Sequence, residues 1–152
     1  MGNRPQTDHH PVHDRPLTSE IVAENYDRWS PPLHADFAVN EHNGRVGGTL
    51  LVDTESLRVW ETRLEPGERL PVHRHVLDYH WIALTDGRAR QHMSDGTSRE
   101  ISYARGQTRY FTVTDGGHHL HDLKNIGDEV LSFLTIESKD GPNEPFDLPQ
   151  DP

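Results

Sequence analysis

Short runs in which apolar and polar residues alternate recur at intervals of about ten residues from position 49 onward. Alternation with a period of two places successive side chains on opposite faces, so each run predicts a half-buried β-strand. The expected strands are Thr49–Val52, Leu57–Leu64, Val72–His75, His80–Thr85, Arg88–Met93, Arg99–Ala104, Thr108–Val113, His118–Leu123 and Val130–Glu137. The chain is therefore predicted to be all-β.

Turn signatures separate these runs. A turn with proline in second place is expected at residues 65–68. Asp-Gly pairs, which supply the positive φ of tight hairpins, stand at Asp86-Gly87, Asp95-Gly96 and Asp115-Gly116. Consecutive hairpins of short strands favour a largely antiparallel barrel or jelly roll, which protects its strand edges, with an immunoglobulin-like sandwich as the alternative.

The two ends of the chain differ from its middle. Residues 1–17 are rich in proline, charge and histidine, a composition that predicts a flexible arm. In the following segment Val22, Tyr26 and Trp29 have the spacing of a short amphipathic helix, and a strand fits almost equally well. Pro31-Pro32 would end either element. We expect one β-barrel domain over residues 18–137 and a Pro-rich C-terminal tail over 138–152.

Composition narrows the classes of partner. The formal net charge of −10 would repel a phosphate backbone and anionic lipid, so neither nucleic acid nor a membrane is an expected partner. No apolar run approaches the roughly 18 residues of a membrane helix, and the N-terminus has no signal-peptide pattern. We therefore expect a soluble, cytoplasmic protein. The absence of cysteine removes thiolate nucleophiles and cysteine-based metal sites, while histidine supplies 12 of the 152 residues.

Several histidines are placed to share a metal ion. His73 and His75 lie two apart in one predicted strand, so their imidazoles point to the same face. His80 begins the next run and would face inward together with Ile82 and Leu84. Strands that converge in a barrel interior bring such ligands together from distant parts of the chain.

A further ligand comes from a later strand. His121 shares a face with His119 and Leu123, and His119 is expected to line the pocket. Tyr79 and Trp81 alternate with His80 and are expected on the opposite face, as core residues. The predicted metal ligands are His73, His75, His80 and His121.

The spacing of these residues resembles that of a known family. The first cupin motif resembles a run that begins at Gly67 and ends at Gly87. In this run five residues separate Gly67 from His73-Arg74-His75, four more lead to His80, and six more lead to Gly87. The cupin motif normally carries Glu where His80 stands. The run from His121 to Asn125 resembles the end of the second cupin motif. The resemblance covers residues 57–137 and implies a cupin-type jelly-roll β-barrel, with a short N-terminal helix or strand added. Cupins resembling this chain are often dimers, so a homodimer is expected.

The ligand set indicates the chemistry. Imidazole binds zinc, copper, iron, nickel and manganese, and an octahedral ion held by four histidines keeps two positions for a chelating substrate or for substrate and dioxygen. The site resembles all-histidine sites of cupin oxygenases that act on thiols or diketones, and that of a polyketide-cyclising cupin. We expect one divalent transition metal ion, iron first, with nickel, manganese or zinc as alternatives.

The expected function is that of a mononuclear metal-dependent dioxygenase-like oxidoreductase acting on a small organic acid, enol or diketone. One alternative is a metal-dependent isomerase, lyase or cyclase, which needs a positioned acid or base. The candidates for that catalytic role are His119 and Tyr110. Another alternative is a cupin that binds a small molecule without turnover, because the fold alone does not fix an activity.

Overall fold

The computed structural model describes residues 18–148. The predicted flexible arm at residues 1–17 and the last four residues of the predicted tail lie outside this range. No helix of the described part is long and apolar enough to cross a membrane.

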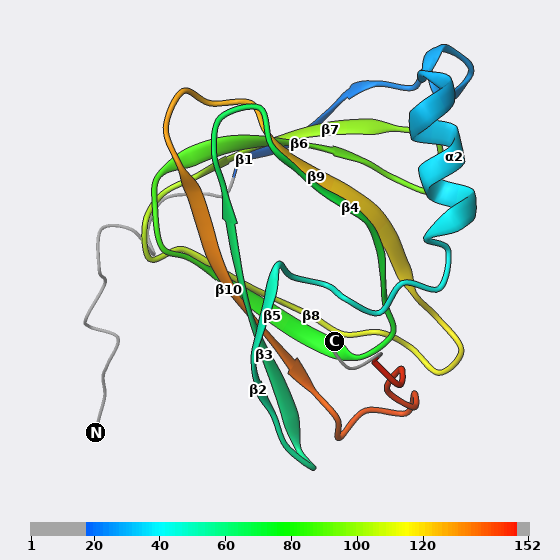
Figure 1. Ribbon diagram of the computed structural model, residues 1–152, viewed down its shortest axis with the longest axis vertical. Helices are drawn as coiled ribbons and strands as arrows, with labels where there is room; N and C mark the ends of the chain where they lie inside the picture. The colour runs from blue at the N-terminus through cyan, green and yellow to red at the C-terminus, as the bar shows by residue number, and fades with distance from the viewer. Residues whose placement is uncertain (1–17, 149–152) are drawn as a thin grey trace, which may run out of the picture.

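Two five-stranded antiparallel sheets form the structure (Figure 1). The first sheet has the strand order β1-β7-β6-β9-β4, and the second has the order β2-β3-β10-β5-β8. The strands are β1 (Thr18–Ala23), β2 (Thr49–Asp53), β3 (Leu57–Leu64), β4 (Arg69–His75), β5 (Asp78–Ala83), β6 (Gly87–His92), β7 (Ser98–Tyr103), β8 (Thr108–Phe111), β9 (His119–Asn125) and β10 (Leu131–Ser138). The chain passes from one sheet to the other after most strands, and this connectivity confirms the predicted jelly roll.

The Asp-Gly turns have different roles in this topology. Asp95-Gly96 joins the neighbouring strands β6 and β7 as predicted, and Gly96 has a φ of +90°. The hairpins expected at Asp86-Gly87 and Asp115-Gly116 are wrong, because both segments carry the chain between the sheets. At Gly87 a Cβ atom would lie 2.6 Å from Leu131 Cδ1, so close packing, not a positive φ, requires glycine there.

Of the two elements expected between Val22 and Trp29, the structure has the strand, β1, and after it only a 3₁₀ helix at Tyr26–Arg28. β1 pairs with β7, a long-range contact that overrides the local spacing of apolar residues. The Pro31-Pro32 pair begins a helix instead of ending an element: α2 spans Pro31–Val39 and is capped by Ser30, whose Oγ accepts from Leu33 N–H at 3.4 Å. Proline suits the first turn of a helix, where its missing N–H costs no hydrogen bond.

The apolar core occupies one end of the barrel. It contains Leu64, Ala83, Ala89, Ile101, Tyr103, Leu123, Leu131 and Phe133. The described part of the C-terminal tail packs on the barrel, since Arg58 Nη2 donates to the carbonyl of Phe146 at 2.7 Å and Lys139 Nζ lies 2.7 Å from Asp53 Oδ1.

Candidate metal centre

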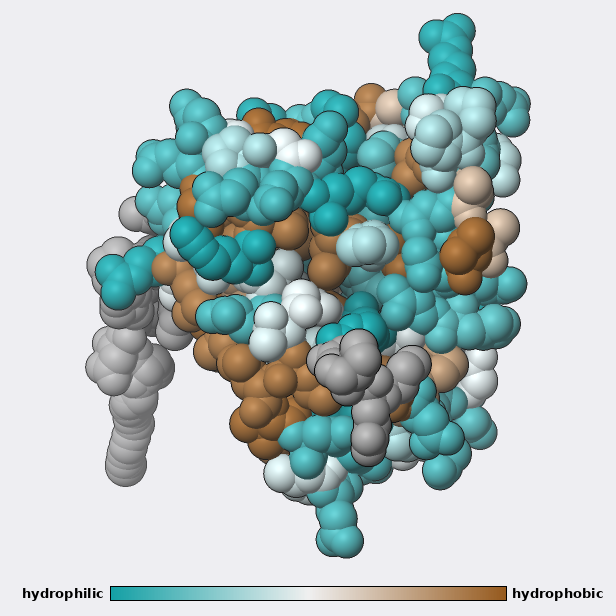
Figure 2. Space-filling model, in the orientation of Figure 1, coloured by the Kyte–Doolittle hydropathy of each residue, from teal (hydrophilic) through white to brown (hydrophobic). Residues whose placement is uncertain are grey.

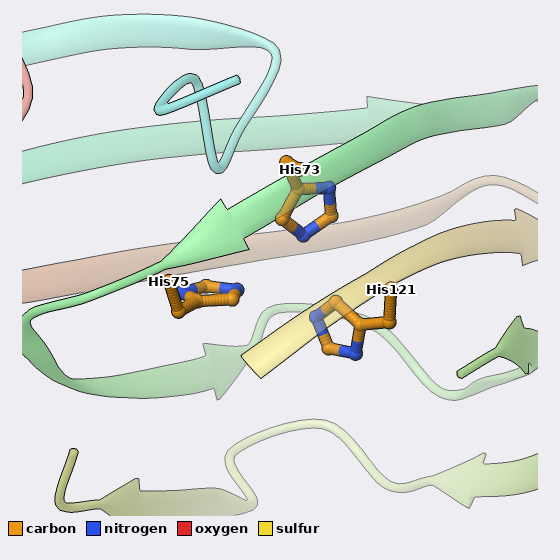
Figure 3. A group of neighbouring side chains, drawn as sticks. All are labelled: His73, His75 and His121. Atoms are coloured by element: carbon orange, nitrogen blue, oxygen red, sulfur yellow. The ribbon is translucent and has the colours of Figure 1, made fainter. Parts of the chain in front are cut away.

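Three histidines meet inside the barrel (Figure 3). His73 and His75 lie on β4, and His121 lies on β9, directly opposite His73 in the antiparallel register. One nitrogen atom of each imidazole lies within 4.8 Å of a nitrogen of the other two. All three side chains are buried. The two cupin-like motifs therefore deliver three of the four predicted ligands to one point.

The surroundings keep these imidazoles neutral and leave two of them with an unpartnered Nδ1 atom. Burial lowers the pKa of His73, and it lowers those of His75 and His121 well below the usual value, with a further lowering by the neighbouring imidazoles. His73 Nδ1 lies 2.8 Å from the Pro71 carbonyl, which holds the proton on that atom and leaves Nε2 as a lone-pair donor. The Nδ1 atoms of His75 and His121 are buried without a hydrogen-bond partner.

A metal ion fits this donor set. Neutral imidazoles are the form that binds metals, and buried polar atoms normally have partners. His73, His75 and His121 would hold the ion, and they offer nitrogen donors alone. Ligation by these three residues stays a prediction, and the ion has no assigned identity.

The fourth predicted ligand does not join the cluster. His80 lies on β5, half-buried, with its ring 6.0 Å from that of Tyr110 on the outer face of the second sheet. The expectation that His80 faces inward is wrong. The odd positions 73, 75, 79 and 81 all line the cavity, so the alternation of β4 continues through the link at residues 76–77 and places the even position of His80 on the outer face.

Tyr79 and Trp81 take the inward positions of β5, contrary to the prediction. The Tyr79 ring stacks on the imidazole of His75, with ring centroids 3.8 Å apart and an interplanar angle of 15°. The Tyr79 hydroxyl lies 3.0 Å from His119 Nδ1, and burial raises the pKa of Tyr79, which keeps the hydroxyl protonated. The predicted core position of Tyr79 is confirmed by its burial, but its contact with the histidine cluster was not predicted.

The three histidines border an internal cavity of about 350 Å³. Its wall is formed by Ser19, Val46, Thr62, Leu70, His73, His75, Tyr79, Trp81, Gln91, Met93, Arg99, Ile101, Tyr103, Arg109, Phe111, His119, His121, Leu123, Phe133 and Thr135. Within the described residues 18–148, no aspartate or glutamate lines this cavity. The formal charges on its wall come from Arg99 on β7 of the first sheet and Arg109 on β8 of the second sheet.

The two predicted catalytic residues have different positions. His119 lines the cavity, is half-buried and has a pKa lowered by burial, so it is a neutral base beside the cluster. Tyr110 is 58% exposed and lies on the outer face, so it has no access to the cavity and the prediction of its catalytic role is wrong. Phe111, the next residue, faces inward and stacks on Tyr79.

A polar cluster supports β9 behind the candidate centre. Asp122 is fully buried, accepts from Arg69 Nε at 2.6 Å and accepts from the His92 backbone N–H at 2.6 Å. The Arg69 guanidinium also pairs with Asp36 of α2 at 2.6 Å. These contacts fix the strand that carries His121, and no feature of the sequence singled them out.

Comparison with known proteins gives relatives of one fold. No family model matches the chain. Over 102 residues, or 62% of its length, the chain is 31% identical to oxalate decarboxylase OxdC of Bacillus subtilis strain 168, and it spans 26% of that relative. Among solved structures, a cupin domain of Bordetella pertussis Tohama I is similar over 60% of this chain and 90% of its own, with 27% identity and a TM-score of 0.54.

These likenesses agree with the strand order and with the position of the histidines on β4 and β9. The fold is a jelly roll, the spacing of His73, His75 and His121 follows the cupin motifs, and both relatives are cupins. The chain belongs to the cupin superfamily.

Proposed function

We propose that the protein is a mononuclear metal-dependent oxygenase that acts on a small organic acid, enol or diketone bound in the cavity. The observation that carries the proposal is the meeting of three neutral imidazoles, two of which have a buried Nδ1 atom with no hydrogen-bond partner, at the wall of a cavity that no carboxylate of residues 18–148 lines. Such a pocket, with a few convergent polar groups, is the usual form of a small-molecule site.

The charge of the cavity favours an anionic substrate. The chain has 25 acidic residues and a net charge of −10, yet the cavity wall carries the guanidinium groups of Arg99 and Arg109 and no acidic side chain from residues 18–148. Arg99 Nη1 donates to Ser19 Oγ at 3.1 Å, and Arg109 lies over the Phe111 ring at 5.4 Å. Arg99 lies close enough to Asp95 to lower the pKa of that carboxyl, whereas Arg109 forms no ion pair with a carboxylate of the described residues, so Arg109 is the first candidate to bind a substrate anion.

The relative in Bacillus subtilis, named for its action on oxalate, supports a small organic acid as the substrate class. We propose iron as the ion, because an oxygenase needs a metal that can change its oxidation state. When bound, such an ion would supply Lewis-acid and redox chemistry at the three histidines. Three histidines leave three positions of an octahedral ion, which suffice for a chelating substrate and dioxygen.

The chain's own residues position the substrate and manage protons. Arg99 and Arg109 orient the anion, and the aromatic rings of Tyr79 and Phe111 exclude water from the face beside His75. His119 can accept a proton from the substrate, with its Nδ1 atom fixed by the Tyr79 hydroxyl. This pair also favours a second candidate, a metal-dependent isomerase, lyase or cyclase, because such a reaction requires an acid or base beside the metal.

The test is oxygen uptake by iron-loaded protein in the presence of oxalate, longer organic acids and diketones. The proposal expects uptake that matches substrate loss, is abolished in His121→Ala and is retained in His80→Ala. Substrate loss without oxygen uptake would assign the second candidate. Binding without turnover would refute both.

The role of the arginines in substrate binding can be tested with a matched control variant. Arg109→Gln should raise the KM for an acid at least about tenfold, the usual effect of losing a charge-assisted contact. Arg63→Gln should leave KM unchanged, because Arg63 is exposed and pairs with Glu65 away from the cavity. Equal KM values for the two variants would remove the arginine argument.

A further inference from the structure

A second cavity lies on the outer face of the first sheet, separate from the three histidines. Its volume is about 710 Å³, and its wall is formed by residues of β1, β4, β6, β7 and β9 and by the segment at 25–33 that leads into α2. Arg90 and His92 line this cavity, whereas Gln91 between them lines the inner one, as alternation along β6 requires. We call this second cavity the outer groove.

The outer groove is basic, although the chain as a whole is acidic. Four of its lining residues carry a positive charge: Arg28, Arg69, Arg90 and Lys124. Among residues 18–148, Glu100 is its one carboxylate, against a net charge of −10 for the whole chain. Figure 2 shows hydrophilic residues over much of the part of the molecule that contains the first sheet, whereas hydrophobic residues gather over β2 and β3. Cations gathered in a cavity attract anions to it.

Lys124 stands at the centre of a row of three cations. Antiparallel pairing sets it opposite Arg69 of β4 on one side and opposite Arg90 of β6 on the other. Both arginines have carboxylate partners: Arg69 pairs with the two aspartates described above, and Arg90 Nη2 lies 2.5 Å from Glu100 Oε2. Lys124 is exposed and forms no ion pair with a carboxylate of residues 18–148. Like charges directly opposite each other destabilise a sheet, so a bound anion would stabilise this row.

Two further groups of the outer groove can bind an anion. Arg28 lies in η1 (Tyr26–Arg28), is exposed, and likewise has no carboxylate partner within the described range. His92 is held in place by Asp122, whose Oδ2 lies 3.0 Å from His92 Nδ1. This contact fixes a proton on Nδ1 and leaves Nε2 as a hydrogen-bonding group of the groove. The Trp29 ring packs edge-on against the same imidazole, with ring centroids 5.2 Å apart.

We propose that the outer groove binds a small molecule through a phosphate group. A phosphate carries up to two negative charges and three oxygens, so it can be shared by several cations, whereas a carboxylate is matched by a single guanidinium. The volume of about 710 Å³ lies within the usual range of small-molecule sites, roughly 300–1,000 Å³. The net charge of −10 disfavours an extended polyanion such as nucleic acid.

The test is titration of the protein with inorganic phosphate and with pyrophosphate, measured by calorimetry and by the ¹H–¹⁵N NMR spectrum. We expect binding that shifts the amide signals of Lys124 and Arg28. Lys124→Gln and Arg28→Gln should each raise the Kd at least about tenfold, the usual effect of losing a charge-assisted contact. Arg63→Gln is the matched control, because Arg63 is exposed on β3 of the second sheet and should leave the Kd unchanged.

A further variant distinguishes the outer groove from the inner cavity, whose wall also carries arginine. Arg109→Gln should leave the Kd and the shifts at Lys124 unchanged. Loss of binding in Arg109→Gln but not in Lys124→Gln would place the anion in the inner cavity and overturn the proposal. No binding of either anion at millimolar concentration would overturn it as well. Acetate that binds as tightly as phosphate would refute the assignment of a phosphate group.

Discussion

Glu137 should make the protein less stable as pH rises from acid to neutral. The side chain is 3% exposed on β10, and its Oε1 accepts from Trp60 Nε1 at 2.7 Å. Burial raises the pKa of this carboxyl to about 7, and neither that hydrogen bond nor the nearby Arg58 offsets the effect. The folded state therefore holds a proton that the unfolded state releases near pH 4.5. The stability from this proton is complete below that pH and is lost as pH rises through about 7.

The magnitude follows from the shift. A pKa raised from 4.5 to about 7 corresponds to about 3 kcal/mol of unfolding free energy. Glu137→Gln keeps an acceptor for Trp60 and cannot ionise. We expect the variant to match the wild type near pH 4.5, and to exceed it by up to about 3 kcal/mol, or about 6–12 °C in Tm, above pH 7.

The assay is urea unfolding of metal-free protein at both pH values. The difference between variant and wild type is taken at each pH, so other groups that titrate in both proteins cancel. A difference that does not change with pH would refute the assignment of a buried, protonated carboxyl at Glu137.

Two further predictions concern the candidate centre and its support. Asp122→Asn should lower the free energy of unfolding in urea by about 3 kcal/mol, because it removes a buried charged partner of Arg69. Asp53→Asn is the control, since it removes a partly exposed ion pair and should lower that free energy by about 1 kcal/mol or less. Equal losses in the two variants would contradict the structural role of Asp122. A chelator should remove the metal faster only when the pH falls below the ordinary imidazole pKa of about 6.5. Burial lowers the pKa of His73, His75 and His121, so protons compete with the metal for these imidazoles only at lower pH. Release that already accelerates above about pH 6.5, measured by metal analysis, would argue against buried histidine ligands with lowered pKa values.

The strands of the barrel, and the shared faces of the three histidines that meet in it, could be predicted from the sequence because both depend on short-range periodicity. Alternation along β4 fixes that His73 and His75 share a face, and the same rule on β9 joins His121 to His119. The orientation predicted for β5 is wrong, because the spacing of the cupin-like motif favours an inward His80. The odd positions 73, 75, 79 and 81 all line the cavity, so the alternation of β4 in fact continues through residues 76–77. Nothing in the local sequence shows that a link between two sheets keeps this alternation.

Long-range contacts account for the other differences between the expected and the observed structure. β1 is a strand because β7 offers it a paired edge, whereas its apolar spacing alone is compatible with a helix. The carboxylate-free cavity depends on the meeting of β7 and β8 residues, including Arg99 and Arg109, from opposite sheets. Neither pairing nor sheet membership has a signal in the local sequence.

Metal content is the most direct test of the three-histidine centre. The protein is purified without a histidine tag, and the metal bound per chain is measured for the wild type, His73→Ala, His121→Ala and His80→Ala, with folding checked by far-UV circular dichroism. We expect one ion per chain in the wild type and in His80→Ala, and loss of the ion from folded His73→Ala and His121→Ala. Retention of a full ion by both of those variants, or its loss from His80→Ala, would refute the three-histidine centre.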